Sequence, residues 1–185
     1  MKKGIIILIL FATSIVAGAQ TQYFTKNGKV FFNATSPLEK IEATNEKAVS
    51  IIDASTGAME FSELMKAFSF DKALMQEHFN ENYVESDKFP KAVFKGNVTN
   101  MSSVDLKKDG TYPVKVKGML TLHGETKEVQ ADGTLTVKDG GINSGKSEFK
   151  IIPQDYKIEI PSVVKDKIAK EILINVDVNY APKTS

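Results

Sequence analysis

The segment GGINSGKS, residues 140–147, matches the phosphate-loop pattern G-x-x-x-x-G-K-[ST] of nucleotide-binding enzymes. In such a loop Lys146 would reach the phosphates and Ser147 would bind magnesium. The chemistry also needs a helix directly after the loop, because a helix N-terminus supplies aligned backbone amides. Here the next residues, KSEFKIIP, alternate between polar and apolar side chains and end in a proline, which predicts a strand. We therefore interpret Asp139-Gly140-Gly141 and Asn143-Ser144-Gly145 as turn residues that join two strands.

Other residue types that carry chemistry are sparse. The chain has no cysteine and two histidines, His78 and His123. A zinc site normally needs three or four ligands, and no H-E-x-x-H motif is present. The G-x-S-x-G motif of serine hydrolases is also missing. The sequence thus predicts no metal, no cofactor and no catalytic nucleophile, while acid–base work by paired carboxylates stays open because spatial pairing is invisible in sequence.

The N-terminus predicts an exported protein. Lys2 and Lys3 precede an apolar run over residues 5–16, which small residues follow up to Ala19. This order is typical of a secretory signal peptide, and the run is shorter than the roughly 20 residues that span a bilayer. We expect a signal peptide over residues 1–19, cleavage before Gln20, and a mature protein in the periplasm or outside the cell.

Charge and hydropathy exclude two classes of partner. The formal net charge of +1 becomes −1 when Lys2 and Lys3 are removed with the signal peptide. The remaining chain has no concentrated basic block, so nucleic acid is not an expected partner. No later apolar run reaches membrane-spanning length, which argues against stable membrane insertion. Without cysteines, the domain has to be held together by packing alone.

From residue 21 onward the dominant pattern has period two, which is typical of half-buried strands. About eight or nine strands are expected, including a hairpin at Asn27-Gly28, the strongest short turn signal in the chain. One face of residues 112–122 is apolar, as are one face of residues 92–98 and one face of residues 172–180. Antiparallel strands of this kind form a sandwich or a barrel. Glycines within strands, at positions 96, 118 and 133, permit sharp curvature and favour the barrel.

Two short helices interrupt the strands. In residues 69–83, SFDKALMQEHFNENY, apolar side chains recur near helical spacing, and Asp71 suits a helix N-terminus. In residues 161–170, PSVVKDKIAK, Ser162 is the expected N-cap. There is no internal repeat, so we expect a single domain.

Two further segments carry a resemblance to a known family. MQEHFNENYVESDKFPKAVFKG (residues 75–96) and GMLTLHGETKEV (residues 118–129) resemble the YceI-like, polyisoprenoid-binding-like family of exported proteins. The matching features are a helix that leads into a "KFP-x-x-x-F" strand and a later "LT-x-HG-x-TK" hairpin. The likeness extends from about residue 28 to residue 180.

The resemblance implies an all-β, mainly antiparallel fold over residues 20–185: an extended eight-stranded, lipocalin-like barrel with one or two short helices. In some members the lumen holds an isoprenoid chain. It also implies that Gly124 adopts unusual turn angles and that His123 bonds locally to Thr126. The chain departs from the family pattern where R-x-D-aromatic-G-I is replaced by PQDYKI, residues 153–158. A His-Ser lead-in before the first long strand is also missing.

The hypothesis that follows is a non-enzymatic protein that carries or sequesters a long-chain amphipathic lipid of isoprenoid type. The candidate lumen residues are Phe61, Phe70, Leu74, Phe79, Phe94, Leu120, Leu122, Phe149, Ile174 and Val176. Two alternatives stay open: a stress-response or interaction module with a filled core that acts through its outer surface, and a hydrolase or isomerase that uses carboxylates at the barrel mouth. Such a barrel could also form a homodimer through an exposed apolar patch.

Overall fold

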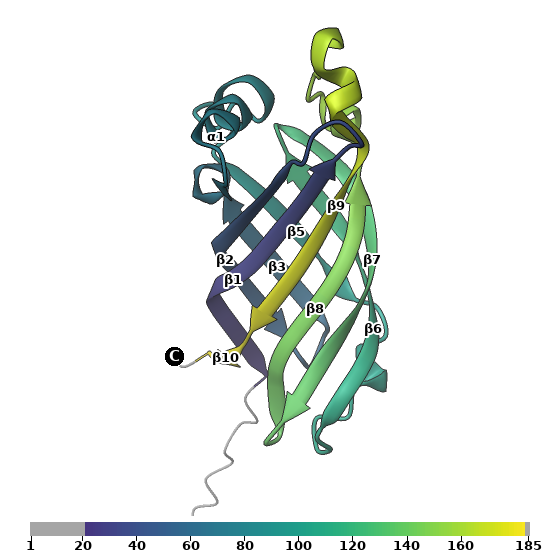
Figure 1. The fold of residues 1–185 in the computed structure, drawn as a ribbon. Coiled ribbons are helices and arrows are strands. Elements are labelled where there is room, and N and C mark those ends of the chain that lie inside the picture. The colour runs from purple at the N-terminus through teal and green to yellow at the C-terminus, as the bar shows by residue number, and fades with distance from the viewer. Residues whose placement is uncertain (1–20, 184–185) are drawn as a thin grey trace, which may run out of the picture.

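The computed structural model describes residues 21–183, which form one elongated, closed barrel of antiparallel strands (Figure 1). The predicted signal peptide, residues 1–19, lies outside the described residues. The eight barrel strands are β1 (Gln22–Thr35), β2 (Glu42–Asp53), β3 (Ala58–Leu64), β5 (Lys91–Val98), β6 (Gly110–Leu122), β7 (Glu125–Lys138), β8 (Gly141–Ile151) and β9 (Ile168–Asn179). The eight-stranded barrel expected from the sequence is confirmed.

The strands follow one another around the barrel in the order β1-β9-β8-β7-β6-β5-β3-β2, and β1 also pairs with β2 to close it. All of these pairings are antiparallel. Two additional two-residue strands lie against the barrel: β4 (Ser69–Phe70) pairs with β2, and β10 (Ala181–Pro182) pairs with β1. Closure gives every barrel strand a partner on both sides, so backbone groups are satisfied without a free sheet edge.

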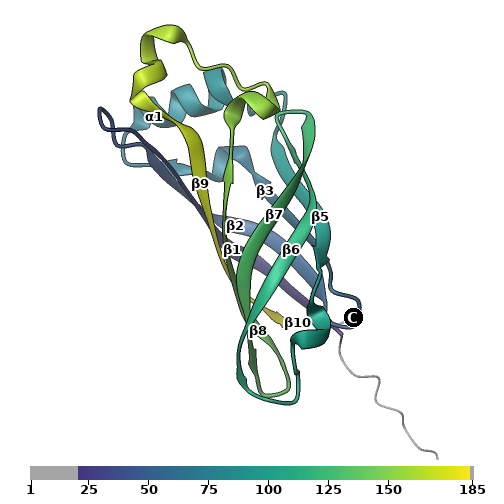
Figure 2. The same ribbon diagram turned by 90° about the vertical axis from the view of Figure 1, so that its right-hand side faces the viewer.

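Most helical segments gather at one end of the barrel, which we call the helical end, while η3 (Met101–Ser103) lies at the opposite end (Figures 1 and 2). At the helical end, α1 (Ala73–His78) continues directly into the π-helical segment η2 (Phe79–Tyr83), and the 3₁₀ helix η5 (Ser162–Lys167) precedes β9. Three shorter 3₁₀ turns are η1 (Met65–Ala67), η3 and η4 (Pro153–Tyr156).

The second expected helix is therefore present only as 3₁₀ structure. Its N-cap is Pro161, and no side chain caps it, so the prediction of Ser162 as a cap was wrong. The stiff, β-branched Val163 and Val164 disfavour a regular α-helix. The chain enters β9 at Ile168, immediately after this single irregular stretch.

Asn27-Gly28 forms an irregularity within β1, and the predicted hairpin at this position was wrong. Strand β1 continues through both residues, while its register against β2 shifts on each side of Gly28. A Cβ atom on Gly28 would approach Val178 Cγ1 to 2.9 Å. The glycine thus lets neighbouring strands pack closely at a β-bulge, which is the other common role of glycine in a strand.

Two-residue turns occur instead at His123-Gly124 and at Asp139-Gly140. The φ angles are +50° and +77° in the first and +53° and +80° in the second, as type I′ turns require. The unusual angles expected for Gly124 are confirmed. Gly140 opens the segment GGINSGKS, and the rest of that segment lies in β8. No helix follows Lys146, which excludes the phosphate-loop alternative. The interpretation as a turn is correct for Asp139-Gly140 and was wrong for Asn143-Ser144-Gly145, which lies within β8.

The end of the barrel opposite the helices is filled. Buried side chains from several strands pack there into one cluster, which includes Ile52, Val137 and Ile142. Within it the Ser50 and Tyr180 hydroxyl oxygens lie 2.8 Å apart in a buried hydrogen bond. Burial raises the pKa of Tyr180 to about 12, so this phenol stays protonated and able to donate.

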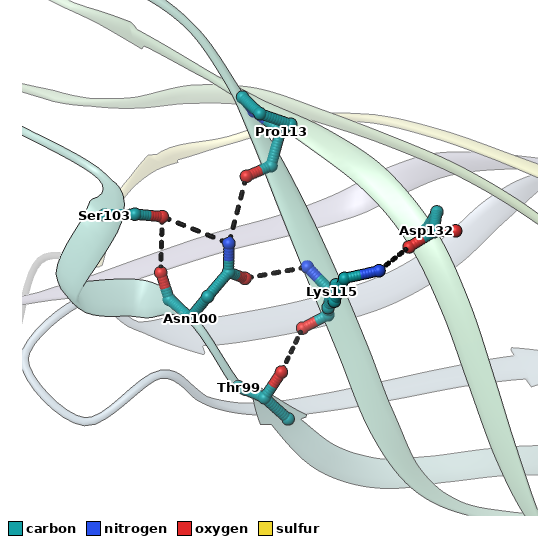
Figure 3. A network of polar contacts seen from close by, with 6 residues as sticks. All are labelled: Thr99, Asn100, Ser103, Pro113, Lys115 and Asp132. Atoms are coloured by element: carbon teal, nitrogen blue, oxygen red, sulfur yellow. Dashed lines mark hydrogen bonds and ion pairs between the residues drawn. The ribbon is translucent and has the colours of Figure 1, made fainter.

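A polar network fixes the connection between β5 and β6 at this filled end (Figure 3). The Asn100 side chain donates to the Pro113 carbonyl at 3.1 Å and accepts from the Lys115 amide at 2.8 Å. Ser103 donates to the Asn100 carbonyl at 2.7 Å, and Lys115 Nζ contacts Asp132 at 2.9 Å on the neighbouring strand. Side-chain hydrogen bonds therefore hold the loop to β6, and they replace regular strand pairing there.

Two glycines face each other across β5 and β6 halfway along the barrel. Gly96 is paired with Gly118, and the Phe94 ring lies against both. A Cβ atom on Gly118 would lie 2.4 Å from the Lys95 carbonyl oxygen and 2.6 Å from Gly96 Cα. These backbone atoms cannot move aside, so the aromatic ring occupies space that side chains at 96 and 118 would need.

We predict that Gly118→Ala destabilises the fold by about 1–3 kcal/mol, because the new methyl group overpacks against backbone atoms. Gly110→Ala on the same strand is the matched control, since its Cβ atom would meet nothing closer than 3.7 Å. We expect this control to change stability by less than about 0.5 kcal/mol. Denaturant-induced unfolding measures both, and equal effects of the two substitutions would contradict the packing argument.

Candidate functional site

The helical half of the barrel contains an apolar cavity of about 350 Å³. Its lining on β9 runs from Ile168 to Val176, which corresponds to about 26 Å along the strand and roughly 20 Å along the axis of a barrel with tilted strands. The lining also includes His78 of α1 and Lys167 of η5, and both of these residues are exposed. The cavity therefore opens at the helical end, between α1 and η5.

The opposite end of the cavity is closed by the filled part of the barrel. Met59, Val116 and Val176 line the cavity and also pack against the buried cluster around Ile52 and Val137. The hollow is thus a blind pocket with one opening. A volume of this size lies within the usual range of small-molecule sites.

Aromatic rings form much of the wall near the opening. The Phe32 ring lies 5.4 Å from that of Phe68, 5.6 Å from that of Phe70 and 5.5 Å from that of Phe79, measured between centroids. The rings of Phe70 and Phe79 are 5.1 Å apart. Such contacts stabilise the attachment of α1 and η2 to the strands, and they leave flat apolar surfaces turned to the cavity.

Nine of the ten candidate lumen residues line this cavity, and the structure brings them together from five strands and two neighbouring short elements. They are Phe61, Phe70, Phe79, Phe94, Leu120, Leu122, Phe149, Ile174 and Val176. Leu74 does not line it: its side chain is 61% exposed on the outer side of α1. The placement of Leu74 in the lumen was therefore wrong, because the docking of α1 turns Met75 and His78 toward the cavity instead.

The most informative residue that the sequence analysis missed is Glu63. It lines the cavity together with Met59 and Phe61 of the same strand. The period-two alternation of β3 places all three on one face. That signal was available in the sequence, but a charged residue is not an expected member of an apolar face.

Glu63 is an acid in an apolar environment. Its Oε2 atom is buried and has no hydrogen-bond partner among the described residues. The surface that the side chain does expose faces the cavity, which it lines. Burial raises the pKa of Glu63 from 4.5 to about 8, because desolvation disfavours the carboxylate. At neutral pH the side chain is therefore mainly the uncharged carboxylic acid.

The polar groups at the opening are paired differently. Glu39 accepts a hydrogen bond from Lys72 Nζ at 2.9 Å, and this contact lowers the pKa of the Glu39 carboxyl. His78 Nδ1 lies 3.0 Å from the Asn82 side-chain nitrogen. Charge is thus found at the rim, where water reaches it, while the acid deeper in the pocket is neutral.

His123 joins the two segments that carry the family resemblance, although its partners differ from the prediction. Its Nδ1 atom lies 2.9 Å from the Tyr156 carbonyl oxygen, and its Nε2 atom lies 2.8 Å from Glu85 Oε2. Thr126 instead pairs with the hydroxyl of Thr121, so the expected bond between His123 and Thr126 was wrong. The local bond fails because the type I′ turn directs the imidazole toward segments 33 and 38 residues away.

The Phe89 ring completes this junction. The centroid of the Phe89 ring lies 4.5 Å from that of His123. A Cβ atom on Gly124 would lie 2.7 Å from Cε1 of Phe89. The "KFP" and "HG" residues are therefore in direct contact. They hold the chain that leaves η2 against the β6–β7 hairpin, which is a structural role.

Within residues 21–183, no three His, Asp or Glu side chains are grouped as a metal site would require. None of the helices in this part of the chain combines the length and apolar character needed to cross a membrane.

We predict that stability falls as the pH rises from about 4.5 to about 8, because folded Glu63 keeps a proton that the unfolded chain releases. The stabilising contribution is complete below pH 4.5, and the loss reaches about 1.4 kcal/mol per pH unit. Glu63→Gln removes this slope, whereas Glu60→Gln on the outer face of β3 keeps it. Unfolding free energies of the lipid-free variants across this range test the prediction, and an unchanged slope in Glu63→Gln would contradict it.

Comparison with known proteins identifies the family to which this architecture belongs. The family model of the YceI-like domain matches residues 17–180. Comparison with curated proteins found no match. Several solved structures are similar, each at an identity that shows a shared fold alone, and three of them are as follows.

A polyisoprenoid binding domain from Saccharophagus degradans, implicated in plant cell wall breakdown, aligns with a TM-score of 0.74 and 11% identity over 89% of this chain and 99% of that chain. BcnA from Burkholderia cenocepacia aligns with a TM-score of 0.67 and 14% identity, over 83% and 96% of the two chains. The YceI protein of Campylobacter jejuni gives a TM-score of 0.50 and 14% identity, over 100% and 94%. The family model matches most of this chain, and the chain forms a closed barrel of the same fold as the similar structures. This chain therefore belongs to the YceI-like family.

Proposed function

We propose that the protein is an exported, non-enzymatic carrier that holds a long-chain lipid of isoprenoid type in the barrel. The observation that carries the proposal is the blind apolar cavity, which opens at the helical end and is lined almost wholly by apolar side chains. The similar domain from Saccharophagus degradans is described as polyisoprenoid binding, which supports the same class of ligand here.

The physical case for a hydrocarbon chain is simple. Each CH₂ group that leaves water for the cavity contributes about 0.8 kcal/mol. A chain that follows the roughly 20 Å of apolar lining therefore gains enough to offset the loss of its rotational and translational freedom. Aromatic walls such as Phe32 and Phe79 add dispersion contacts. This binding needs no catalytic group.

Export rests on the N-terminal residues. A signal peptide over residues 1–19 would deliver the mature protein to the periplasm or the exterior, where a lipid has to be shielded from water between membranes. N-terminal sequencing of the protein from its native host tests the cleavage site before Gln20.

Solvent extraction and mass spectrometry of the protein purified from its native host test the carrier function. We expect a copurifying long-chain lipid in near-stoichiometric yield. A lipid-free protein that also fails to take up long-chain lipids would leave the alternative, an interaction module that acts through its outer surface.

We predict that Ala131→Phe weakens lipid binding about tenfold or more, because it introduces a ring near the closed end of the cavity, where Ala131 pairs with Val116. Excluding even two CH₂ groups costs about 1.6 kcal/mol. Gln130→Phe is the matched control, because the neighbouring side chain points out of the same strand and is exposed. Binding titrations with a polyprenyl lipid measure both, and thermal unfolding confirms that the variants fold. Equal affinities for the two variants would place the lipid outside the cavity.

The rim of the opening has exposed apolar side chains from three segments: Leu38 is 68% exposed, Leu74 61% and Val163 86%. The sequence leaves open a homodimer that forms through an exposed apolar patch, and we propose this rim as that surface. Analytical ultracentrifugation of the wild type and of a Leu74→Ser/Val163→Ser variant tests it. The proposal requires a wild-type dimer that the substitutions dissociate, and a wild-type monomer would refute it.

A further inference from the structure

Glu63 lines the cavity from the C-terminal end of β3. On β3 it pairs with Ala92 of β5, two residues beyond the pair Phe61–Phe94. The floor residue Met59 is four residues away on the same strand, about 13 Å along it. The carboxyl group therefore has apolar lining on both sides of it along the barrel.

The missing partner of Glu63 is unusual for this protein. Asn45 buries its side-chain nitrogen but donates to the Leu64 carbonyl at 3.0 Å, and the buried Ser50 bonds to Tyr180. Among described residues, the other buried side-chain oxygen without a partner is Oδ1 of Asn80, which does not line the cavity. Buried polar groups are almost always hydrogen-bonded, so an orphaned carboxyl turned to an open pocket indicates a ligand group that completes it.

The surroundings of Glu63 argue against a negatively charged ligand group. Strands β2 and β5 flank β3, and their inward positions carry no titratable side chain. The other titratable groups in the cavity lining are Glu39, His78, Tyr83 and Lys167. The carboxyl of Glu39 is already bonded to Lys72, and His78 and Lys167 are exposed at the rim. A phosphate at the depth of Glu63 would meet an acid and no cation, at a large desolvation cost.

We propose that Glu63 hydrogen-bonds an uncharged oxygen of the lipid cargo, a hydroxyl or a carbonyl, inside the barrel, and that the cavity thereby selects against phosphate-bearing lipids. The inference rests on the proposed carrier function and adds the chemical class of the ligand. A protonated carboxyl suits this role because it donates through its O–H and accepts through its other oxygen.

The test uses four lipids with the same polyprenyl chain: the alcohol, the phosphate monoester, the primary amine and the hydrocarbon without a polar group. At pH 6 we expect the wild type to bind the alcohol about 3- to 10-fold more tightly than the hydrocarbon, which is the range for one net hydrogen bond. The phosphate monoester should bind more weakly than the alcohol.

Two substitutions isolate the side chain. Glu63→Met removes the hydrogen bond at similar volume, so the preference for the alcohol over the hydrocarbon should disappear while the hydrocarbon still binds. Glu63→Gln keeps a donor and an acceptor and should retain the preference. Glu60→Met on the outer face of β3, where Glu60 pairs with Lys95, is the matched control and should behave as wild type.

The pH dependence gives an independent readout. Raising the pH above about 8 ionises wild-type Glu63, which then accepts a charge-assisted hydrogen bond from the hydroxyl. The preference for the alcohol over the hydrocarbon should therefore rise in the wild type and stay unchanged in Glu63→Gln. Both proteins keep Glu39, His78, Tyr83 and Lys167, so titration of those groups affects both equally.

The outcomes separate this inference from the function on which it rests. If the hydrocarbon binds but the wild type shows no preference for the alcohol, or if the phosphate or the amine binds best through Glu63, the role assigned to Glu63 is wrong and the carrier function stands. If none of the four lipids binds, the carrier function fails and this inference fails with it.

Discussion

Closure of the sheet between β1 and β2 is the constraint on which the rest of the structure depends. It gives all eight strands a common inner face, and period-two alternation then decides which side chains share that interior. An eight-stranded barrel is just wide enough to be filled by its own side chains or to admit one slender ligand. Whether any level is solid or hollow is therefore decided locally, by the residues that point inward there.

The interiors of the two halves of this barrel are packed differently. At the filled end, Ile52, Val137, Ile142 and their neighbours interdigitate, and the Ser50–Tyr180 bond fixes their arrangement. Toward the helical end, the wall aromatics pack against one another at the perimeter, where α1 and η2 hold them. Rings that pack against one another along the wall leave the axis open. The same barrel geometry therefore provides both a rigid base and a pocket.

The sequence correctly predicted the side-chain positions that strand alternation determines. The predictions failed for positions and hydrogen bonds that depend on contacts distant in the sequence. Inward-facing strand residues such as Phe94 follow from period two, because a closed sheet leaves one face dry. Leu74 was misplaced because the rotation of a short helix is set by its docking, which local spacing does not encode. His123 finds its partners far along the chain, at Glu85 and Tyr156. Asn27-Gly28 fits a turn and a bulge equally well, and only the length of β1 distinguishes them.

Glu63 shows how a residue that violates the local pattern can be the most informative one. A glutamine at this position would avoid the cost of holding an acid away from water, and a methionine would avoid the unpaired oxygen as well. For stability alone, either replacement is better, and the barrel satisfies its other deep polar groups, Asn45 and Ser50. Departures of this kind concentrate at functional sites, where a gain on binding offsets a loss on folding. The hollow around Glu63 and its unsatisfied oxygen are therefore both accounted for by the ligand that we propose, one with a complementary polar group.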